Sequence, residues 1–214
     1  MNDPEYTHNI RKAWALEENP EKIQEYYKDW SQTYDQDVEN ETYLAPGTAV
    51  ALLMQSLNHD ELDPMQVLDA GCGTGLVGEL LKEVGFSSIK GFDLSADMVA
   101  KAQDKNVYDQ LWDGIDLNRS LADQIGADEF DVVTCVGVLT LGHVPPSGFD
   151  RLLDVTKLNG LVVINARDAY VEEHEFEAHC DQLESSGRVR FLQRKYLQST
   201  GDSLALFLVA ERLS

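Results

Sequence analysis

Three glycines and two aspartates carry the chemistry that stands out in this sequence. Gly71, Gly73 and Gly75 alternate in a short run, and Asp69 lies two residues before the first of them. Glycine has no Cβ and adopts positive φ readily, so a ligand can lie directly against the backbone of such a turn. Asp93 follows at the end of a second apolar segment. A carboxylate at that place accepts hydrogen bonds from the diol of a ribose.

These residues need a strand, a turn, a helix and a second strand to hold them together. The apolar run over 66–70 predicts the first strand, 76–84 predicts the helix, and 88–94 predicts the second strand. The helix begins at the glycine turn, so its free N–H groups face the same space as the turn. The segment therefore predicts a nucleoside-binding βαβ unit.

Two cofactors use this layout. The run from Gly73 to Gly78 satisfies the G-x-G-x-x-G pattern of a dinucleotide site, which is weak evidence by itself. The longer string over 67–75 resembles motif I of the class I S-adenosylmethionine (AdoMet)-dependent methyltransferases. In that family the acid that matches Asp69 lies near the methionine amino group. AdoMet has no pyrophosphate, and it needs acceptors for an ammonium and a diol. The resemblance therefore favours AdoMet, and NAD(P) is the alternative.

A second string strengthens this resemblance. The run from Asp93 through Leu94 and Ser95 to Met98 resembles motif II of the same family. There the acid binds the ribose and the methionine flanks the adenine. Ser95 also precedes the helix expected over 96–103, and serine is a favoured N-cap residue.

An aromatic segment precedes the glycine turn. Apolar and aromatic side chains recur at steps of three and four residues from Ile23 to Tyr34, which predicts a helical face. Tyr27, Trp30 and Tyr34 match the Y-x-x-W-(A/S)-x-x-Y-D segment of many small-molecule methyltransferases, where the rings line the methionine end of AdoMet. The segment predicts a lid over the cofactor, and the alternative is rings that pack on the core. We expect residues 1–45 to form an N-terminal arm followed by this lid, and the arm to contain a short helix near 10–16. Residues 46–214 are expected to form the AdoMet-binding domain.

Later segments match the family more weakly. Asp116 and Leu117 resemble its acidic turn after the third strand, which meets the adenine, and Asp113 is the rival at this position. Cys135 and Val136 resemble motif IV, whose backbone passes the methionine part of the cofactor. The resemblance implies cofactor-binding roles for Tyr27, Trp30, Tyr34, Asp69, Gly71, Cys72, Gly73, Thr74, Gly75, Asp93, Leu94, Ser95, Met98, Asp116, Leu117, Cys135 and Val136.

His143 is the candidate catalytic residue. It follows the strand expected over 130–139 in a loop that opens at the carboxyl edge of the sheet, where open α/β sheets bind ligands. An unperturbed imidazole titrates near neutrality, so His143 could act as the general base for an acceptor that must lose a proton. The alternative is that His143 stabilises its loop.

The remaining pattern predicts the rest of the sheet. Strands are expected near 110–116, 130–139 and 161–166, helices over 43–57, 148–156 and 171–186, and a hairpin over 188–198 and 203–212. The expected fold is α/β and Rossmann-like, of the class I methyltransferase type. It has a seven-stranded, mostly parallel sheet with an antiparallel C-terminal strand, helices on both faces and an N-terminal helical lid.

Composition limits the partners. The 214 residues include 38 acidic and 17 basic side chains, a formal charge of −21, which disfavours nucleic acid and anionic membranes. Three unevenly spaced cysteines are typical of a reducing compartment. The first residues lack the basic and apolar parts of a signal peptide, and no apolar run is long enough to span a membrane. These features predict a cytoplasmic protein, a monomer or a homodimer.

No metal site is expected. His174 and His179 lie within the acidic helix expected over 171–186 but are five residues apart, one more than in H-E-x-x-H, so they lie on different faces.

The loop over 136–145 resembles the Williams–Beuren-region methyltransferase-like proteins and bacterial small-molecule methyltransferases. The expected activity is methyl transfer from AdoMet to an O, N or S atom of a small molecule. The alternatives are an AdoMet-binding sensor or partner-binding protein without turnover, and an NAD(P)-dependent oxidoreductase.

Overall fold

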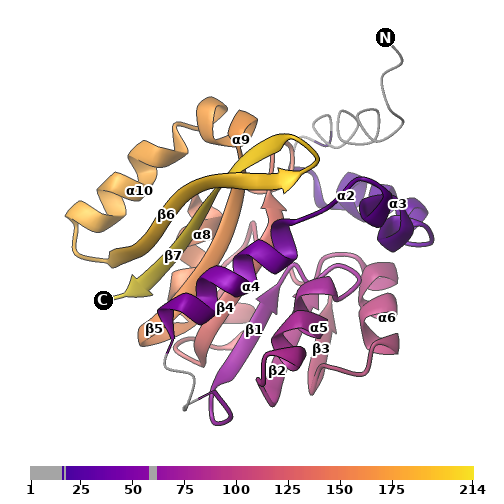
Figure 1. The fold of residues 1–214 in the computed structure, drawn as a ribbon, viewed down its shortest axis with the longest axis horizontal. Helices are drawn as coiled ribbons and strands as arrows, with labels where there is room; N and C mark the ends of the chain where they lie inside the picture. The colour runs from indigo at the N-terminus through magenta and orange to yellow at the C-terminus, as the bar shows by residue number, and fades with distance from the viewer. Residues whose placement is uncertain (1–15, 17, 58–61) are drawn as a thin grey trace.

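A seven-stranded sheet forms the centre of the molecule in the computed structural model, which describes residue 16 and residues 18–57 and 62–214 (Figure 1). The strand order is β3-β2-β1-β4-β5-β7-β6. Strands β1 to β5 pair in parallel, whereas β7 runs antiparallel to both β5 and β6. The predicted mostly parallel sheet with an antiparallel C-terminal strand is therefore confirmed. The strands are β1 (Gln66–Ala70), β2 (Ser88–Asp93), β3 (Gln110–Asp113), β4 (Phe130–Leu139), β5 (Thr156–Arg167), β6 (Val189–Thr200) and β7 (Ser203–Arg212).

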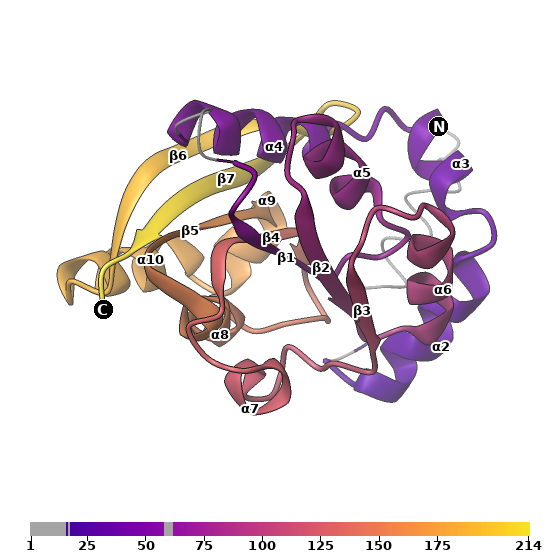
Figure 2. The same cartoon turned by 90° about the horizontal axis from the view of Figure 1, so that it is seen from below.

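Helices cover both faces of this sheet. Figure 2 shows α4 and α5 on one face and α7, α8 and α10 on the other. The helices are α2 (Pro20–Trp30), α3 (Tyr34–Asn40), α4 (Ala45–Ser56), α5 (Leu76–Glu83), α6 (Ala96–Asp104), α7 (Leu121–Ile125), α8 (Ser147–Val155), α9 (Asp168–Glu173) and α10 (Phe176–Ser185). The short helix expected near 10–16 lies outside the described residues, apart from its last position.

Side-chain alternation along the strands divides the core into two layers. In β5, Val162 and Ile164 pack with α8 and α10, whereas Leu161 and Val163 pack with α4 and α5. All four side chains are buried, so this strand is covered on both faces. The near-continuous apolar run of β4 has the same cause, because β4 lies between β1 and β5.

Two predicted helices are interrupted. The aromatic helix ends at Trp30, and Tyr34 begins α3. Both the Trp30 indole N–H and the Thr33 hydroxyl donate to the Asp37 carboxylate, at 2.8 Å each, and these bonds hold the turn between the two helices. The helix expected over 171–186 is divided in the same way at Glu175, whose φ of 47° is left-handed.

Smaller differences concern single elements. The third strand ends at Asp113, and β5 begins at Thr156, directly after α8. In α5 the buried face is formed by Val77, Gly78 and Leu81.

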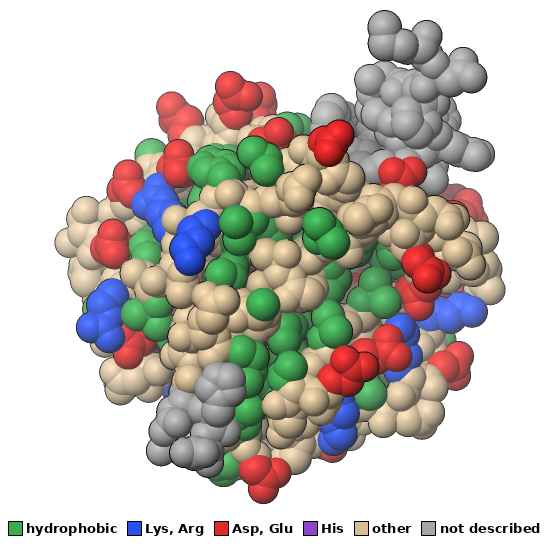
Figure 3. Space-filling view, viewed as in Figure 1, with side chains coloured by type: hydrophobic (Ala, Val, Ile, Leu, Met, Phe, Trp, Pro, Cys, Tyr) green, Lys and Arg blue, Asp and Glu red, His purple; other side chains and the backbone are tan. Residues whose placement is uncertain are grey.

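The surface is acidic, as the composition requires. Acidic side chains are spread over the face shown in Figure 3. No helix in the described part of the chain is long and apolar enough to cross a membrane. The three cysteines are buried and unbridged.

Candidate functional site

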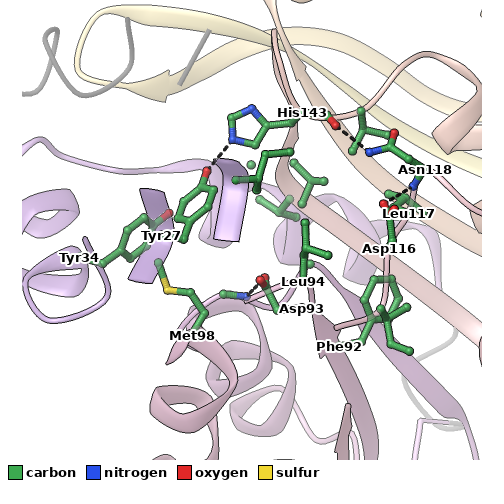
Figure 4. Close-up of a pocket in the computed structure, with 18 residues that line it drawn as sticks. Tyr27, Tyr34, Phe92, Asp93, Leu94, Met98, Asp116, Leu117, Asn118 and His143 are labelled. Carbon is green, nitrogen blue, oxygen red and sulfur yellow. Dashed lines mark hydrogen bonds between the residues drawn. The ribbon is translucent and has the colours of Figure 1, made fainter. Parts of the chain in front are cut away.

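A cavity of about 720 Å³ opens at the carboxyl ends of β1, β2 and β4 (Figure 4). It lies where the predicted βαβ unit and the aromatic helix meet. The predicted site residues that line it are Tyr27, Tyr34, Gly71, Gly73, Asp93, Leu94, Met98, Asp116, Leu117, Val136 and His143.

The glycine turn forms one wall with bare backbone. Gly71, Gly73 and Gly75 have φ values of 69°, 54° and 93°, which residues with a side chain rarely adopt. A Cβ built on Gly73 would have no atom within 4 Å, so the turn presents open space at this point.

Asp93 is the best-placed carboxylate of the cavity. It lies at the end of β2, where one oxygen accepts the Gly73 N–H at 2.9 Å and the other accepts the Ser95 N–H at 2.8 Å. Burial raises the pKa of this carboxyl, and the backbone hydrogen bonds partly offset the shift. An ionised carboxylate has about four acceptor directions, so acceptor capacity remains for a ligand in the cavity.

The loop after β3 forms the opposite wall. The Asp116 carboxylate accepts the Asn118 N–H at 2.8 Å, and the Asn118 side chain donates to the His143 carbonyl at 3.1 Å. These bonds join the loop to the segment after β4. Asp113 is exposed and is not among the lining residues, so the geometry favours Asp116 over its rival.

Other predicted cofactor residues lie behind the lining. Ser95 is the N-cap of α6, and its hydroxyl accepts the Met98 N–H. Thr74 donates to Asp35 of α3, which ties the aromatic region to the glycine turn. The predicted residues outside the cavity lining are Trp30, Asp69, Cys72, Thr74, Gly75, Ser95 and Cys135.

Asp69 is held by protein groups. Its carboxylate accepts the Tyr108 hydroxyl at 2.7 Å and the Thr134 hydroxyl at 3.0 Å. Burial raises the pKa of Asp69 to about 6, despite these hydrogen bonds. The Tyr108 ring reaches Asp69 because Gly78 and Gly91 leave room for it: a Cβ on Gly78 would lie 2.2 Å from the Tyr108 oxygen.

The N-terminal helices bring a row of rings to the cavity. Trp30 lies between two tyrosines, with its ring centroid 6.1 Å from that of Tyr27 and 4.7 Å from that of Tyr34. The Gln24 side chain donates to the Leu94 carbonyl at 3.1 Å, so α2 is fixed against the end of β2. The helices thus lie over the cavity, as the lid prediction expects.

A second cavity adjoins the first at these rings. It shares Tyr27, Tyr34, Gly137 and His143 with the first cavity, so the two meet at these four residues. Its other described lining residues are Tyr26, Trp30, Val38, Tyr43, Thr140 and Arg167.

His143 lies at this junction in a defined protonation state. Its Nδ1 is 3.1 Å from the Leu141 carbonyl, which can only accept, so Nδ1 carries the proton. Its Nε2, 3.0 Å from the Tyr27 oxygen, therefore accepts the Tyr27 hydroxyl (Figure 4). Burial lowers the pKa of His143 to about 4, so the ring is neutral at neutral pH.

Several lining residues were missed by sequence reasoning. Ile23 belonged to the predicted helical face, and Asn118 to the string that resembles the acidic turn, so each had a local signal. Arg167 had none, because it joins the second cavity from the far end of β5. The lining residues of the first cavity that were not predicted are Ile23, Phe92, Ile115, Asn118, Gly137, Val138 and Val144.

The histidines of the acidic helix have structural partners. His179 Nε2 lies 2.7 Å from the Asp150 carboxylate, and His174 packs on the Tyr170 ring. Among the residues that the structure describes, no group of three potential ligands is arranged to hold a metal ion.

Comparisons with known proteins agree with this geometry. Residues 43–201 match a family model described as a methyltransferase domain. Methyltransferase-like protein 27 of Homo sapiens is 35% identical over 187 residues, which cover 86% of this chain and 74% of that protein.

Solved structures show the same fold. Magnesium protoporphyrin IX methyltransferase from Synechocystis PCC 6803, with bound SAH, superposes with a TM-score of 0.66 at 18% identity, covering 90% of this chain and 99% of that one. A chain from the complex of the Haloferax volcanii Trm112 methyltransferase activator with its partner gives a TM-score of 0.67 at 15% identity, covering 90% and 98%. These matches leave the oxidoreductase alternative without support. The chain belongs to the class I AdoMet-dependent methyltransferases.

Proposed function

We propose that this protein transfers the methyl group of AdoMet to an O, N or S atom of a small molecule. The observation that carries the proposal is the convergence of Asp93, the bare glycine turn and the aromatic lid on one cavity. The acidic surface supports a small acceptor, because a charge of −21 repels the phosphates of nucleic acid.

The cavity suits AdoMet part by part. The free acceptor directions of Asp93 would take the ribose hydroxyls, and the Gly73 backbone leaves space for the nucleoside beside it. Met98 and the loop from Asp116 to Asn118 would enclose the adenine. The rings of Tyr27 and Tyr34 would face the sulfonium, since an aromatic face attracts a cation.

The roles of the residues behind the lining follow from their contacts. Asp69 is engaged by Tyr108 and Thr134, so we assign it mainly to holding the glycine turn in shape. Trp30 and Thr74 would fix the lid, through ring packing and the bond to Asp35 respectively.

Bound AdoMet supplies an electrophile that its positive charge already activates. The protein must align the acceptor with the methyl group and exclude water. The Tyr27–His143 pair lines both cavities where they meet and would hold the reacting groups in register. A general-base role for His143 stays a prediction; its lowered pKa makes it a weak base, and the Tyr27 hydroxyl occupies its free nitrogen.

Calorimetry tests the cofactor site. AdoMet and S-adenosylhomocysteine should both bind the purified protein. Asp93→Ala should weaken AdoMet binding by about 1.5–3 kcal/mol, because a charged acceptor of the ribose hydroxyls is lost.

Asp113→Ala is the matched control, since Asp113 ends the neighbouring strand but is not a lining residue. Its affinity should equal that of the wild type. Absence of AdoMet binding to the wild type would contradict the proposal, and unchanged affinity of Asp93→Ala would mean that the ribose binds elsewhere. A cytoplasmic location and a monomeric or dimeric state stay predictions.

A further inference from the structure

The second cavity is placed to hold the methyl acceptor. It meets the cofactor cavity at Tyr27, Tyr34, Gly137 and His143, whereas Asp93 lines the cofactor cavity and not the second one. If AdoMet fills the first cavity as proposed above, its reactive end faces this junction, and a molecule in the second cavity is the one that can reach it. The inference that follows therefore rests on the proposed function.

The walls of the second cavity are mostly aromatic. Tyr26, Tyr27, Trp30, Tyr34 and Tyr43 all contribute rings. Rings of this kind bind flat or apolar bodies through large contact areas. Tyr43 reaches the junction because Gly137 has no side chain: a Cβ there would lie 2.5 Å from the Tyr43 oxygen.

The two cavities differ in the charge of the residues that line them. Asp93 and Asp116 line the first, and their negative charge suits the sulfonium and ammonium groups of AdoMet. Among the described residues that line the second cavity, the permanent charge is that of Arg167 at the end of β5. It lines this cavity together with Tyr27 and His143.

Arginine is suited to one kind of polar group. A guanidinium presents five N–H donors in a planar fork that matches a carboxylate, and it can serve more than one acceptor at a time. The aromatic walls and the guanidinium together favour a ligand with an apolar body and a carboxylate.

The described residues that line the second cavity include no strong base at the junction. His143 is neutral, and the Tyr27 hydroxyl donates to its Nε2. A carboxylate is already ionised at neutral pH and needs no base.

We propose that the acceptor is a small carboxylic acid with an aromatic or aliphatic body, bound in the second cavity with its carboxylate on Arg167. The carboxylate oxygen forms a bond to the methyl carbon, the methyl–sulfur bond breaks, and the bonding electron pair stays on sulfur. The products are a methyl ester and neutral S-adenosylhomocysteine, and no proton is released.

Matched probes test this class. Benzoate, phenylacetate, 3-phenylpropionate and octanoate are titrated against the full chain saturated with S-adenosylhomocysteine, and binding is followed by saturation-transfer NMR. The corresponding amides have the same bodies without the charge. At least one acid should bind about tenfold more tightly than its amide. With AdoMet in place of its product, mass spectrometry should detect the methyl ester of that acid.

Variants locate the carboxylate. Arg167→Gln should remove the preference for the acid over the amide and leave AdoMet affinity unchanged, which also shows that the variant is folded. Arg167→Lys should keep part of the preference, because it keeps the charge but not the fork. Arg190→Gln is the matched control, since Arg190 is an exposed arginine of β6 paired with Glu211, and its preference should be intact.

Three results would overturn the inference: equal binding of every acid and its amide, a preference that survives in Arg167→Gln, or methyl transfer to phenethylamine with none to any carboxylate. Failure of the wild type to bind S-adenosylhomocysteine would instead overturn the proposed function.

Discussion

At the scale of single residues, two buried carboxylates of similar appearance in the sequence have different surroundings. Asp93 accepts backbone N–H groups and faces the cavity, whereas Asp69 is enclosed by the hydroxyls of Tyr108 and Thr134. Burial raises both pKa values. Asp93 can therefore offer its remaining acceptor capacity to a ligand, whereas Asp69 is not a lining residue of the cavity.

The raised pKa of Asp69 predicts a pH dependence of stability. Its value rises from 3.8 to about 6 on folding, so between these limits the folded state binds more protons than the unfolded state. The carboxylate therefore contributes stability at low pH that is lost as pH rises through 6, up to about 3 kcal/mol. Asp69→Asn lacks this titration, so the wild type should lose stability relative to the variant from pH 4 to pH 7.

Urea unfolding of both proteins at the two pH values measures this difference, and titrations shared by the two proteins cancel in it. A difference that stays constant with pH would show that Asp69 has an ordinary pKa in the folded protein.

At the scale of elements, α5 and the glycine turn depend on a ring that comes from outside the βαβ unit. Tyr108 precedes β3 and fits against Gly78 of α5 and Gly91 of β2. The absence of side chains at these two glycines is therefore a packing requirement. The G-x-G-x-x-G match at Gly78 arises from this ring, and no dinucleotide is needed to explain it.

Gly78→Ala should destabilise the protein by about 1–3 kcal/mol, because the new Cβ would lie 2.2 Å from the Tyr108 oxygen and displace it from Asp69. Alanine improves the helix by less than this. Gly47→Ala in α4 is the control: nothing lies within 4 Å of its Cβ, so stability should stay or rise by up to about 1 kcal/mol. Thermal unfolding of the two variants measures this difference in stability. Equal midpoints would argue against the contact between Gly78 and the Tyr108 ring.

Much of the element layout follows from the sequence. The bounds of β1 and β4 were predicted at the observed residues, because apolar runs bounded by polar segments are the signature of buried parallel strands. The end of α2 was missed because it depends on Asp37, which bonds Trp30 and Thr33 from beyond the turn.

The site was predictable in part, because only some of its residues belong to local sequence motifs. Asp93 and the glycine turn belong to local motifs, so their residue types and spacing predict them. Arg167 and Tyr108 join the site through tertiary packing, and Tyr108 lies thirty-nine residues from the carboxylate that it bonds. No local pattern carries that information.

At the scale of the whole molecule, the acidic surface dominates. Like charges in a compact molecule repel one another, and this repulsion lowers stability at low ionic strength. Raising sodium chloride from about 0.05 to 0.5 M shortens the screening length from about 14 to 4 Å. The midpoint of thermal unfolding should therefore rise with salt.

Arg190→Glu sharpens this test, because it replaces the exposed partner of Glu211 with a like charge. Its midpoint should lie below that of the wild type at low salt and approach it at high salt. A midpoint that falls with salt in both proteins would show that ion pairs outweigh the net repulsion.

The hairpin at the edge of the sheet has a consequence for the order in which the chain becomes a working enzyme. Strand β6 joins the sheet through β7, which follows it in sequence, and the end of β6 pairs with Tyr43 at Thr200 and accepts the Leu44 N–H at the Ser199 carbonyl, ahead of α4. While a ribosome makes the chain, the nucleoside-binding half and its lid emerge first, but the segment at Tyr43 and Leu44 between the lid and α4 gains its β6 partners only when the hairpin is released. A nascent chain stalled before residue 203 should thus have an early Rossmann core in which this segment is not yet held.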